Sequence, residues 1–150
     1  MKVAAKFLVF GFVIACALLG GCAKEPQHSH AALPDKDGVY FITPREGDVV
    51  TSPVIVRFGL KGKGVAPAGV NQANTGHHHI LIDNPTLPPM NAPFPSDDRH
   101  VHFGGGQTEA AVKLAPGKHT LQLVLGDHLH VPLGPAWVSE RITITVKPGP

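Results

Sequence analysis

Histidine is the residue type in this chain that is best suited to chemistry, and its spacing is not random. The 150 residues include 10 histidines. Random placement would give on the order of 0.7 pairs separated by two positions, the spacing that one face of a strand requires. The sequence instead contains the pairs His28/His30, His77/His79, His100/His102 and His128/His130. This excess calls for a chemical explanation.

Two histidines separated by one residue form a chelating unit when they lie on a β-strand. Residues i and i+2 of a strand point to the same face, about 6.6–7 Å apart. Their imidazoles can lean onto one ion, with about 2.0–2.1 Å from each nitrogen to the metal. The sequence therefore predicts a copper(II) or zinc(II) site. Its candidate ligands are His77, His79, His100, His102, His128 and His130.

Other histidines and the nearby carboxylates have a supporting part in this hypothesis. Asp83 has the strand parity of His77 and His79, and Asp127 directly precedes His128. Either carboxylate could accept a hydrogen bond from a ligating imidazole and fix its tautomer; the alternative is that it caps a turn. His78 and His119 share the parity of buried apolar residues and are expected to be structural, whereas His28 and His30 are expected to be solvated.

The N-terminus has the layout of an export signal. Lys2 and Lys6 precede an uncharged stretch, residues 7–19, which is followed by Gly20-Gly21-Cys22. Thirteen residues of helix reach about 20 Å, which is short of the roughly 30 Å of a bilayer core. Leu19-Gly20-Gly21-Cys22 resembles the bacterial lipobox, which implies that Cys22 is lipidated. The alternative is an ordinary cleaved signal peptide.

These features predict a lipoprotein signal peptide at residues 1–21, a lipidated flexible tether at residues 22–37 and a folded domain at residues 38–147. The predicted location is the cell envelope. Lys24, two positions after Cys22, favours an outer-membrane lipoprotein that faces the periplasm if the cell is Gram-negative. Contact with the membrane is then expected through the N-terminal lipid only.

Removal of the signal changes both the charge and the thiol content. The chain has 13 basic and 11 acidic residues; loss of Lys2 and Lys6 leaves 13 − 2 = 11 basic residues, which balance the 11 acidic ones. No basic excess remains to attract nucleic acid. Cys16 leaves with the signal and Cys22 carries lipid, so no thiol remains for a disulfide or a thiolate site. The expected partners are a metal ion and, as a further possibility, an envelope protein or glycan.

The rest of the chain reads as short strands. Gly 17 and Pro 15 make 32 of 150 residues, about 21%, and only 16% are charged, which excludes a long solvated helix. Apolar residues alternate with polar ones in several segments. The pattern predicts an all-β fold, an immunoglobulin-like antiparallel β-sandwich of seven or eight short strands; a closed barrel is the alternative. The loops at residues 61–76 and 84–99 are long enough to be functional.

Several motifs together resemble a bacterial family of exported, histidine-rich β proteins classed as a domain of unknown function. They are Thr75-Gly76-His77-His78-His79-Ile80-Leu81-Ile82-Asp83, His100-Val101-His102-Phe103-Gly104-Gly105-Gly106-Gln107-Thr108-Glu109, Pro116-Gly117-Lys118-His119-Thr120-Leu121-Gln122-Leu123 and Gly126-Asp127-His128-Leu129-His130-Val131-Pro132. The resemblance covers about residues 38–147. It implies an envelope location and a compact β domain, and it implies no activity.

Three functions follow as hypotheses. The first is an exported lipoprotein that binds copper(II) or zinc(II) for metal handling or storage, with an affinity that falls as the pH drops through about 6.5 because imidazole must be neutral to bind. The second is a non-catalytic envelope binding or scaffold module with a hydrogen-bonded structural histidine cluster. The third is a metal-dependent redox enzyme, which requires an open coordination position. Binding is favoured over catalysis.

Overall fold

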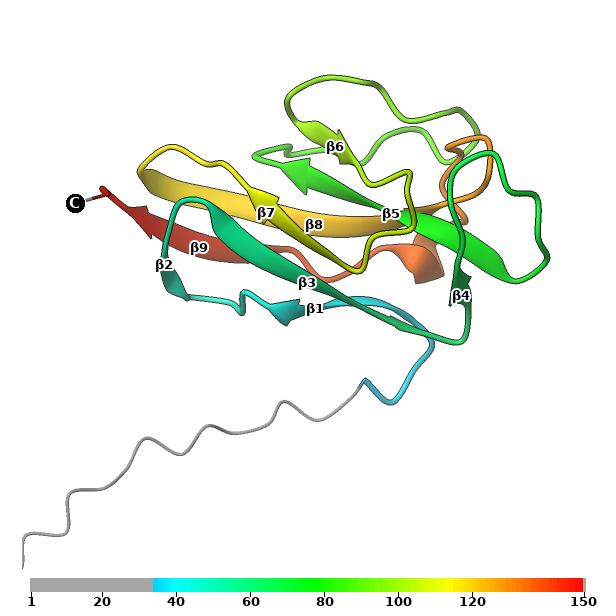
Figure 1. Ribbon diagram of the computed structural model, residues 1–150, viewed down its shortest axis with the longest axis horizontal. Helices are drawn as coiled ribbons and strands as arrows, with labels where there is room; N and C mark the ends of the chain where they lie inside the picture. Colours follow the sequence, from blue (N-terminus) through cyan, green and yellow to red (C-terminus); the bar gives the residue numbers. More distant parts are fainter. Residues whose placement is uncertain (1–33, 150) are drawn as a thin grey trace, which may run out of the picture. The chain divides into compact units, whose positions relative to one another are not determined.

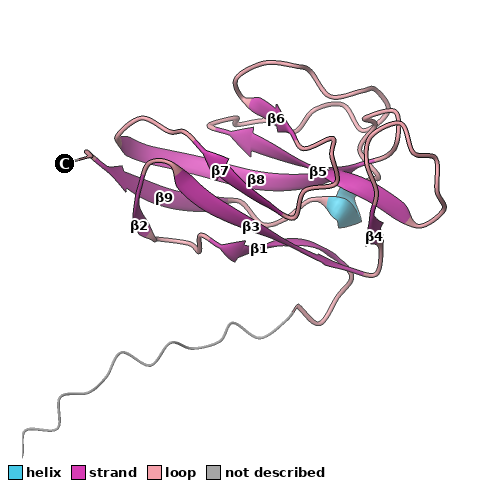
Figure 2. Cartoon of the chain, in the orientation of Figure 1, coloured by secondary structure: helices cyan, strands magenta, loops and turns pink. Residues whose placement is uncertain are grey.

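The computed structural model describes residues 34–149, and these residues form strands and loops with one short helix (Figures 1 and 2). The predicted signal peptide, Cys22 and most of the predicted tether lie outside the described residues. No helix in the described part is long and apolar enough to cross a membrane. The elements are β1 (Gly38–Thr43), β2 (Val49–Thr51), β3 (Val54–Lys61), β4 (Gly64–Val65), β5 (Thr75–Ile82), β6 (His100–His102), β7 (Glu109–Val112), β8 (Gly117–Gly126), a 3-10 helix η1 (Pro135–Trp137) and β9 (Ile142–Lys147).

The strands are arranged in two sheets. The smaller sheet has the order β1-β3-β7, and both of its pairings are antiparallel. The larger sheet has the order β2-β9-β8-β5-β4, and β6 also pairs with β5. In Figure 1 the smaller sheet lies in front of β8 and β9. Strand β5 is central to the larger sheet, because it pairs with β8 on one side and with both β4 and β6 on the other.

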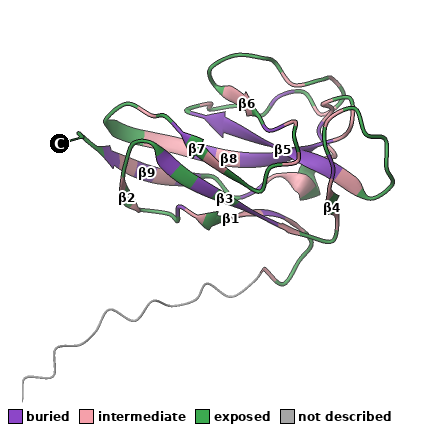
Figure 3. Cartoon of the chain, in the orientation of Figure 1, coloured by how far each residue is buried: buried purple, intermediate pink, exposed green. Residues whose placement is uncertain are grey.

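The two sheets enclose one apolar core, which alternation along the strands creates. Alternate residues from Val54 to Phe58 of β3 and from Leu121 to Leu125 of β8 are apolar and buried in the core. Figure 3 shows this burial along the middle of β5 and β8. The buried core consists of Val39, Val54, Val56, Phe58, Ile80, Ile82, Phe103, Val112, Leu121, Leu123, Leu125, Ile142, Ile144 and Val146.

The larger sheet is also covered on its outer face, where the first half of β5 lies beside the C-terminal end of β8. Residues from His77 to Ile82 of β5 are all buried, although only alternate ones can face the core. Leu81 and Val124 are buried without belonging to the core between the sheets. The loops at residues 83–99 and 127–134 gather at this end in Figure 1. The Phe94 N–H donates a 2.9 Å hydrogen bond to the His130 carbonyl and so ties one loop to the other.

The all-β prediction is confirmed, and two sheets around one core agree with a sandwich. Nine strands are present in the described residues, against the seven or eight predicted. The difference comes from β4, two residues that pair with the start of β5 inside the segment predicted as the loop 61–76. The loop at residues 84–99 is present as predicted. The immunoglobulin-like assignment stays a prediction.

Candidate metal centre

Hydrogen bonding between β5 and β6 brings three histidines together. His77 and His79 occupy alternate positions of β5, and His102 of β6 lies directly opposite His79 in the antiparallel register. Opposite residues and i, i+2 residues share one face of a sheet. The ligand nitrogens of His77, His79 and His102 all lie within 4.8 Å of one another. The backbone of the sheet thus places three donors around one point.

A fourth imidazole reaches the same point from the loop after β8. The ring centroid of His130 lies 4.6 Å from that of His102, 5.0 Å from that of His77 and 6.0 Å from that of His79. The turn that carries His130 is held by Asp127, whose Oδ1 accepts hydrogen bonds from the N–H groups of Leu129 and Val131 at 2.8 and 2.9 Å. We call His77, His79, His102 and His130 the histidine cluster.

The spacing within the histidine cluster is close to that of a tetrahedral site. A metal–nitrogen distance of about 2.0–2.1 Å places each ring centroid about 3.2 Å from the ion, and tetrahedral geometry then separates the centroids by about 5.2 Å. The three centroid distances among His77, His79 and His102 are 4.7, 5.0 and 5.1 Å. The distances to His130 scatter around the same value. Three of the rings, those of His77, His79 and His102, thus fit around a single ion, and the His130 ring lies beside them at a similar spacing.

Two members of the histidine cluster are buried without hydrogen bonds. His77 and His79 are 0% and 1% exposed, and within the described residues no partner meets either ring nitrogen of these side chains. A buried polar group without a partner costs about 1–3 kcal/mol. Neutral imidazole nitrogens that are directed at one point are the donors that zinc and copper prefer. A bound ion would therefore satisfy nitrogens that the protein leaves unpaired.

Burial keeps these imidazoles neutral. Desolvation, together with repulsion from neighbouring imidazoles, lowers the pKa of His77 to about 4 and that of His79 to about 2. Burial, followed by the charge of His130, also lowers the pKa of His102. Asp127 raises the pKa of His77, but this effect is smaller. At His77, His79 and His102 a metal ion would therefore meet less competition from protons near pH 6.5 than at a free imidazole.

The histidine cluster opens on one side into a small cavity. His102 is exposed and His130 is half-buried, in contrast to the two buried rings on β5. The Phe94 ring stacks on that of His79 at 4.0 Å between centroids. The cavity measures about 240 Å³ and is lined by His79, Pro93, Phe94, Pro95, Ser96, His102 and His130. An ion held by the four rings would thus be reached from the 83–99 loop.

Two glycines make room for the rings. A Cβ atom at Gly126 would lie 2.7 Å from Cε1 of His79, and a Cβ atom at Gly104 would collide with Cε1 of His102. Both glycines precede or follow a histidine motif in the sequence. The backbone of β8 and of the loop after β6 can therefore approach the imidazoles only because these positions lack a side chain.

The Gly126→Ala substitution is expected to displace the His79 ring. Overpacking of this kind costs about 1–3 kcal/mol, and the displaced donor should also weaken metal binding. Urea unfolding of the metal-free protein and a metal-competition titration measure the two effects. Gly149→Ala is the matched control, because nothing lies within 4 Å of a Cβ atom there. Equal stability and affinity of the two variants would contradict this account of Gly126.

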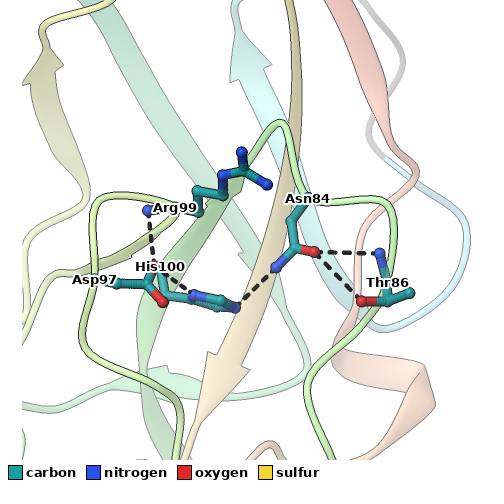
Figure 4. A network of polar contacts seen from close by, with 5 residues as sticks. All are labelled: Asn84, Thr86, Asp97, Arg99 and His100. Atoms are coloured by element: carbon teal, nitrogen blue, oxygen red, sulfur yellow. Dashed lines mark hydrogen bonds and ion pairs between the residues drawn. The ribbon is translucent and has the colours of Figure 1, made fainter.

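His100 is one of the two predicted ligands that the structure keeps apart from the histidine cluster. It lies in β6 opposite Leu81 of β5, two residues before His102 on the same strand. Its Nδ1 is 2.7 Å from Oδ1 of Asp97, and its Nε2 is 2.9 Å from Nδ2 of Asn84 (Figure 4). Because the carboxylate accepts and the amide donates, the neutral ring carries its proton on Nδ1 and both nitrogens are engaged.

His128 is the second predicted ligand that the structure keeps apart from the histidine cluster. It precedes His130 by two positions, but residues 127–131 form a turn in which His130 has a φ of 68°. The same-face rule for i, i+2 residues holds only in extended strands. The His128 carbonyl accepts a hydrogen bond from the Gly69 N–H. The pairs His100/His102 and His128/His130 therefore each supply one member of the histidine cluster, and the pair His77/His79 supplies two.

The predicted supporting carboxylates behave differently from each other. Asp83 is engaged with His119: its Oδ2 lies 2.7 Å from Nδ1 of that ring, and its Oδ1 accepts from the Thr120 N–H. Nε2 of His119 donates to the Ala115 carbonyl, which agrees with a structural role. Asp127 caps the turn, which was the alternative reading, and so supports the histidine cluster by positioning His130.

His78 faces the core, as its parity predicted. It is 0% exposed and packs against Phe58 at 4.9 Å between ring centroids. Burial lowers its pKa to about 4. Its burial agrees with the expected structural role; neither ring nitrogen has a well-formed hydrogen bond within the described residues, although the backbone of Gln107 lies near enough to oppose part of the lowering of its pKa.

Sequence reasoning missed three residues around the site. Phe94 stacks on His79, Asn84 binds His100, and Gly126 makes room for a ring. Gly126, the last residue of β8, stands directly before a histidine motif, and this position was a usable signal. No sequence signal marked Phe94 or Asn84, because a position in a long loop does not reveal which strand the loop covers.

Comparison with known proteins places the chain in a family. No curated protein and no solved structure is similar enough to count as a match. One family does match, over residues 56–147, which is more than half of the chain and includes all four members of the histidine cluster. The chain therefore belongs to the family described as Domain of unknown function (DUF4399).

Proposed function

We propose that this protein is an exported lipoprotein that binds one copper(II) or zinc(II) ion through the histidine cluster, for metal handling or storage. The observation that carries the proposal is the meeting of His77, His79 and His102, whose ligand nitrogens lie within 4.8 Å of one another. Two of these rings are buried with unpaired nitrogens. His130 supplies the fourth donor.

The donor set favours borderline divalent ions. Imidazole nitrogen suits copper and zinc, whereas calcium and magnesium prefer oxygen. Copper binds most tightly to a given set of nitrogen donors, while tetrahedral geometry is the preference of zinc. The centroid spacing in the histidine cluster is compatible with the tetrahedral arrangement.

The location is proposed from the N-terminal sequence. The basic start, the short apolar stretch and the motif that ends at Cys22 support export and lipidation. Lys24 favours the outer membrane and a site that faces the periplasm. Histidine ligands suit such a compartment, because they need no reducing environment to remain able to bind.

The alternative of a purely structural histidine cluster is less well supported. That alternative requires imidazoles that are satisfied by hydrogen bonds. His77 and His79 together have four ring nitrogens without a partner in the described residues. Each unsatisfied buried group costs about 1–3 kcal/mol, and a bound ion would satisfy one nitrogen of each ring, two of the four in all.

Metal binding by the untagged full-length protein, purified in detergent, tests the proposal. We expect one equivalent of copper(II) or zinc(II) with a Kd below about 1 µM, measured by competition dialysis and metal analysis. His28→Ala/His30→Ala removes the H-x-H pair that precedes the predicted domain and should leave this equivalent unchanged. Absence of binding below 1 µM, or its loss in the double variant, would exclude the proposed site.

A further inference from the structure

The histidine cluster brings no negative charge to the ion. Its four donors are neutral imidazoles, and the acidic residues that flank the histidine motifs are engaged elsewhere. Asp83 binds His119, and Asp97 binds His100. Asp127 accepts two backbone N–H groups through Oδ1, and its charge acts on His77 from the turn without a carboxylate oxygen among the candidate ligand atoms. A divalent ion held here would thus keep most of its charge uncompensated by its direct ligands.

The surroundings of that charge are only partly solvated. His77 and His79 are buried, and Phe94 covers one ring. Separating a charge from water is costly unless an opposite charge or oriented dipoles replace the solvent. An anion that coordinates the ion would supply the missing charge directly.

Space for such an anion exists on one side. The cavity of about 240 Å³ has His79, His102 and His130 on one wall and the Pro93–Pro95 segment with Ser96 on the other. Its volume exceeds the roughly 30 Å³ share of one water molecule several times. No acidic or basic side chain lines it. An anion there would meet neither a repelling carboxylate nor a competing ammonium group.

We propose that the metal ion bound by the histidine cluster takes a small monovalent anion, such as a carboxylate or azide, as a fifth ligand in the cavity beneath Phe94. The anion donates one electron pair to the metal, and no other bond changes. Zinc and copper sites accept five ligands. The inference rests on the proposed metal-binding function and adds the class of small molecule that the loaded site accepts.

Titration of the copper(II)-loaded full-length protein with azide tests the inference. We expect a saturable azide-to-copper charge-transfer band and an altered electron paramagnetic resonance spectrum, while the copper stays bound on dialysis. Formate should suppress the band in competition. Formamide, which has a similar shape without the charge, should require at least a tenfold higher concentration than formate to suppress the band to the same extent.

Two variants of the 83–99 loop locate the anion. Ser96→Trp fills the cavity and should weaken azide binding at least tenfold, whereas Leu87→Trp adds the same side chain at an exposed position outside the cavity and should change it less than twofold. Copper content is measured for both variants.

The outcomes separate this inference from the proposed function. Copper that binds normally but shows no azide band overturns the inference alone, as does azide that removes the copper. A band that is equal in Ser96→Trp and Leu87→Trp overturns the placement in the cavity. A protein that binds neither copper(II) nor zinc(II) overturns the proposed function, and the inference fails with it.

Discussion

His102→Ala is expected to weaken copper(II) or zinc(II) binding by at least about 100-fold, whereas His100→Ala should weaken it by less than about tenfold. Both residues lie on β6 and belong to one H-x-H pair, but only His102 reaches the other imidazoles. Loss of groups that merely orient ligands costs about 10–100-fold in affinity, so loss of a direct ligand should exceed that range. Competition with a chromophoric chelator measures both affinities.

A second matched pair extends this test. His130→Ala should resemble His102→Ala, and His128→Ala should resemble the unaltered protein, because only His130 lies against the other rings. His102 is exposed, so its replacement should leave the fold intact, and circular dichroism checks this. Equal losses in His100→Ala and His102→Ala would refute the assignment of ligands.

Acid is expected to destabilise the metal-free protein strongly. In the unfolded chain each histidine binds a proton near pH 6.5. In the folded chain burial lowers the pKa of His77 and His78 to about 4 and that of His79 to about 2. Between pH 6.5 and 4 the unfolded state therefore binds more protons, so stability falls as the pH falls. Each such histidine contributes up to about 1.4 kcal/mol per pH unit to the slope of the unfolding free energy. The three together contribute up to about 4 kcal/mol per pH unit.

Urea unfolding between pH 7 and 4.5, in the presence of a chelator, measures this slope. His79→Gln cannot titrate and should reduce the slope by about 1.4 kcal/mol per pH unit. His119 acts in the opposite direction: burial lowers its pKa, but the hydrogen bond to Asp83 and further contacts outweigh that effect and raise it. Its stabilisation is complete below pH 6.5 and is lost as the pH rises through the raised pKa. Unfolding curves that coincide at pH 7 and pH 5 would contradict the buried, neutral state of the histidines.

The strands were predictable where one face alone is buried. The alternation of Val54, Val56 and Phe58 in β3 marks such a strand, and the structure confirms it. Strand β4 was not predictable, because Gly64 and Val65 carry no pattern and pair only through the backbone. The burial of both faces of β5 was indicated by a continuous run of apolar residues toward the end of the strand. The sequence could not show which loops cover the outer face.

The site was predictable to the extent that strand geometry holds. His77 and His79 lie on an extended strand, so the i, i+2 rule applies. The rule fails for His128 and His130 because a turn with positive φ carries them. It holds for the backbone of His100 and His102, yet Asn84 and Asp97 engage the first ring. Pairings between distant segments decide such cases, and spacing along the chain does not encode them.

The shortness of β6 has a consequence for release of the ion. This strand has three residues and pairs only with β5 among the described strands. Short strands at the margin of a sheet open locally at a much lower free energy than the whole domain. When β6 frays, His102 moves away while His77 and His79 stay fixed on β5. If the histidine cluster holds an ion as proposed, detachment of this one short segment from β5 would release it without separating the strands that enclose the apolar core.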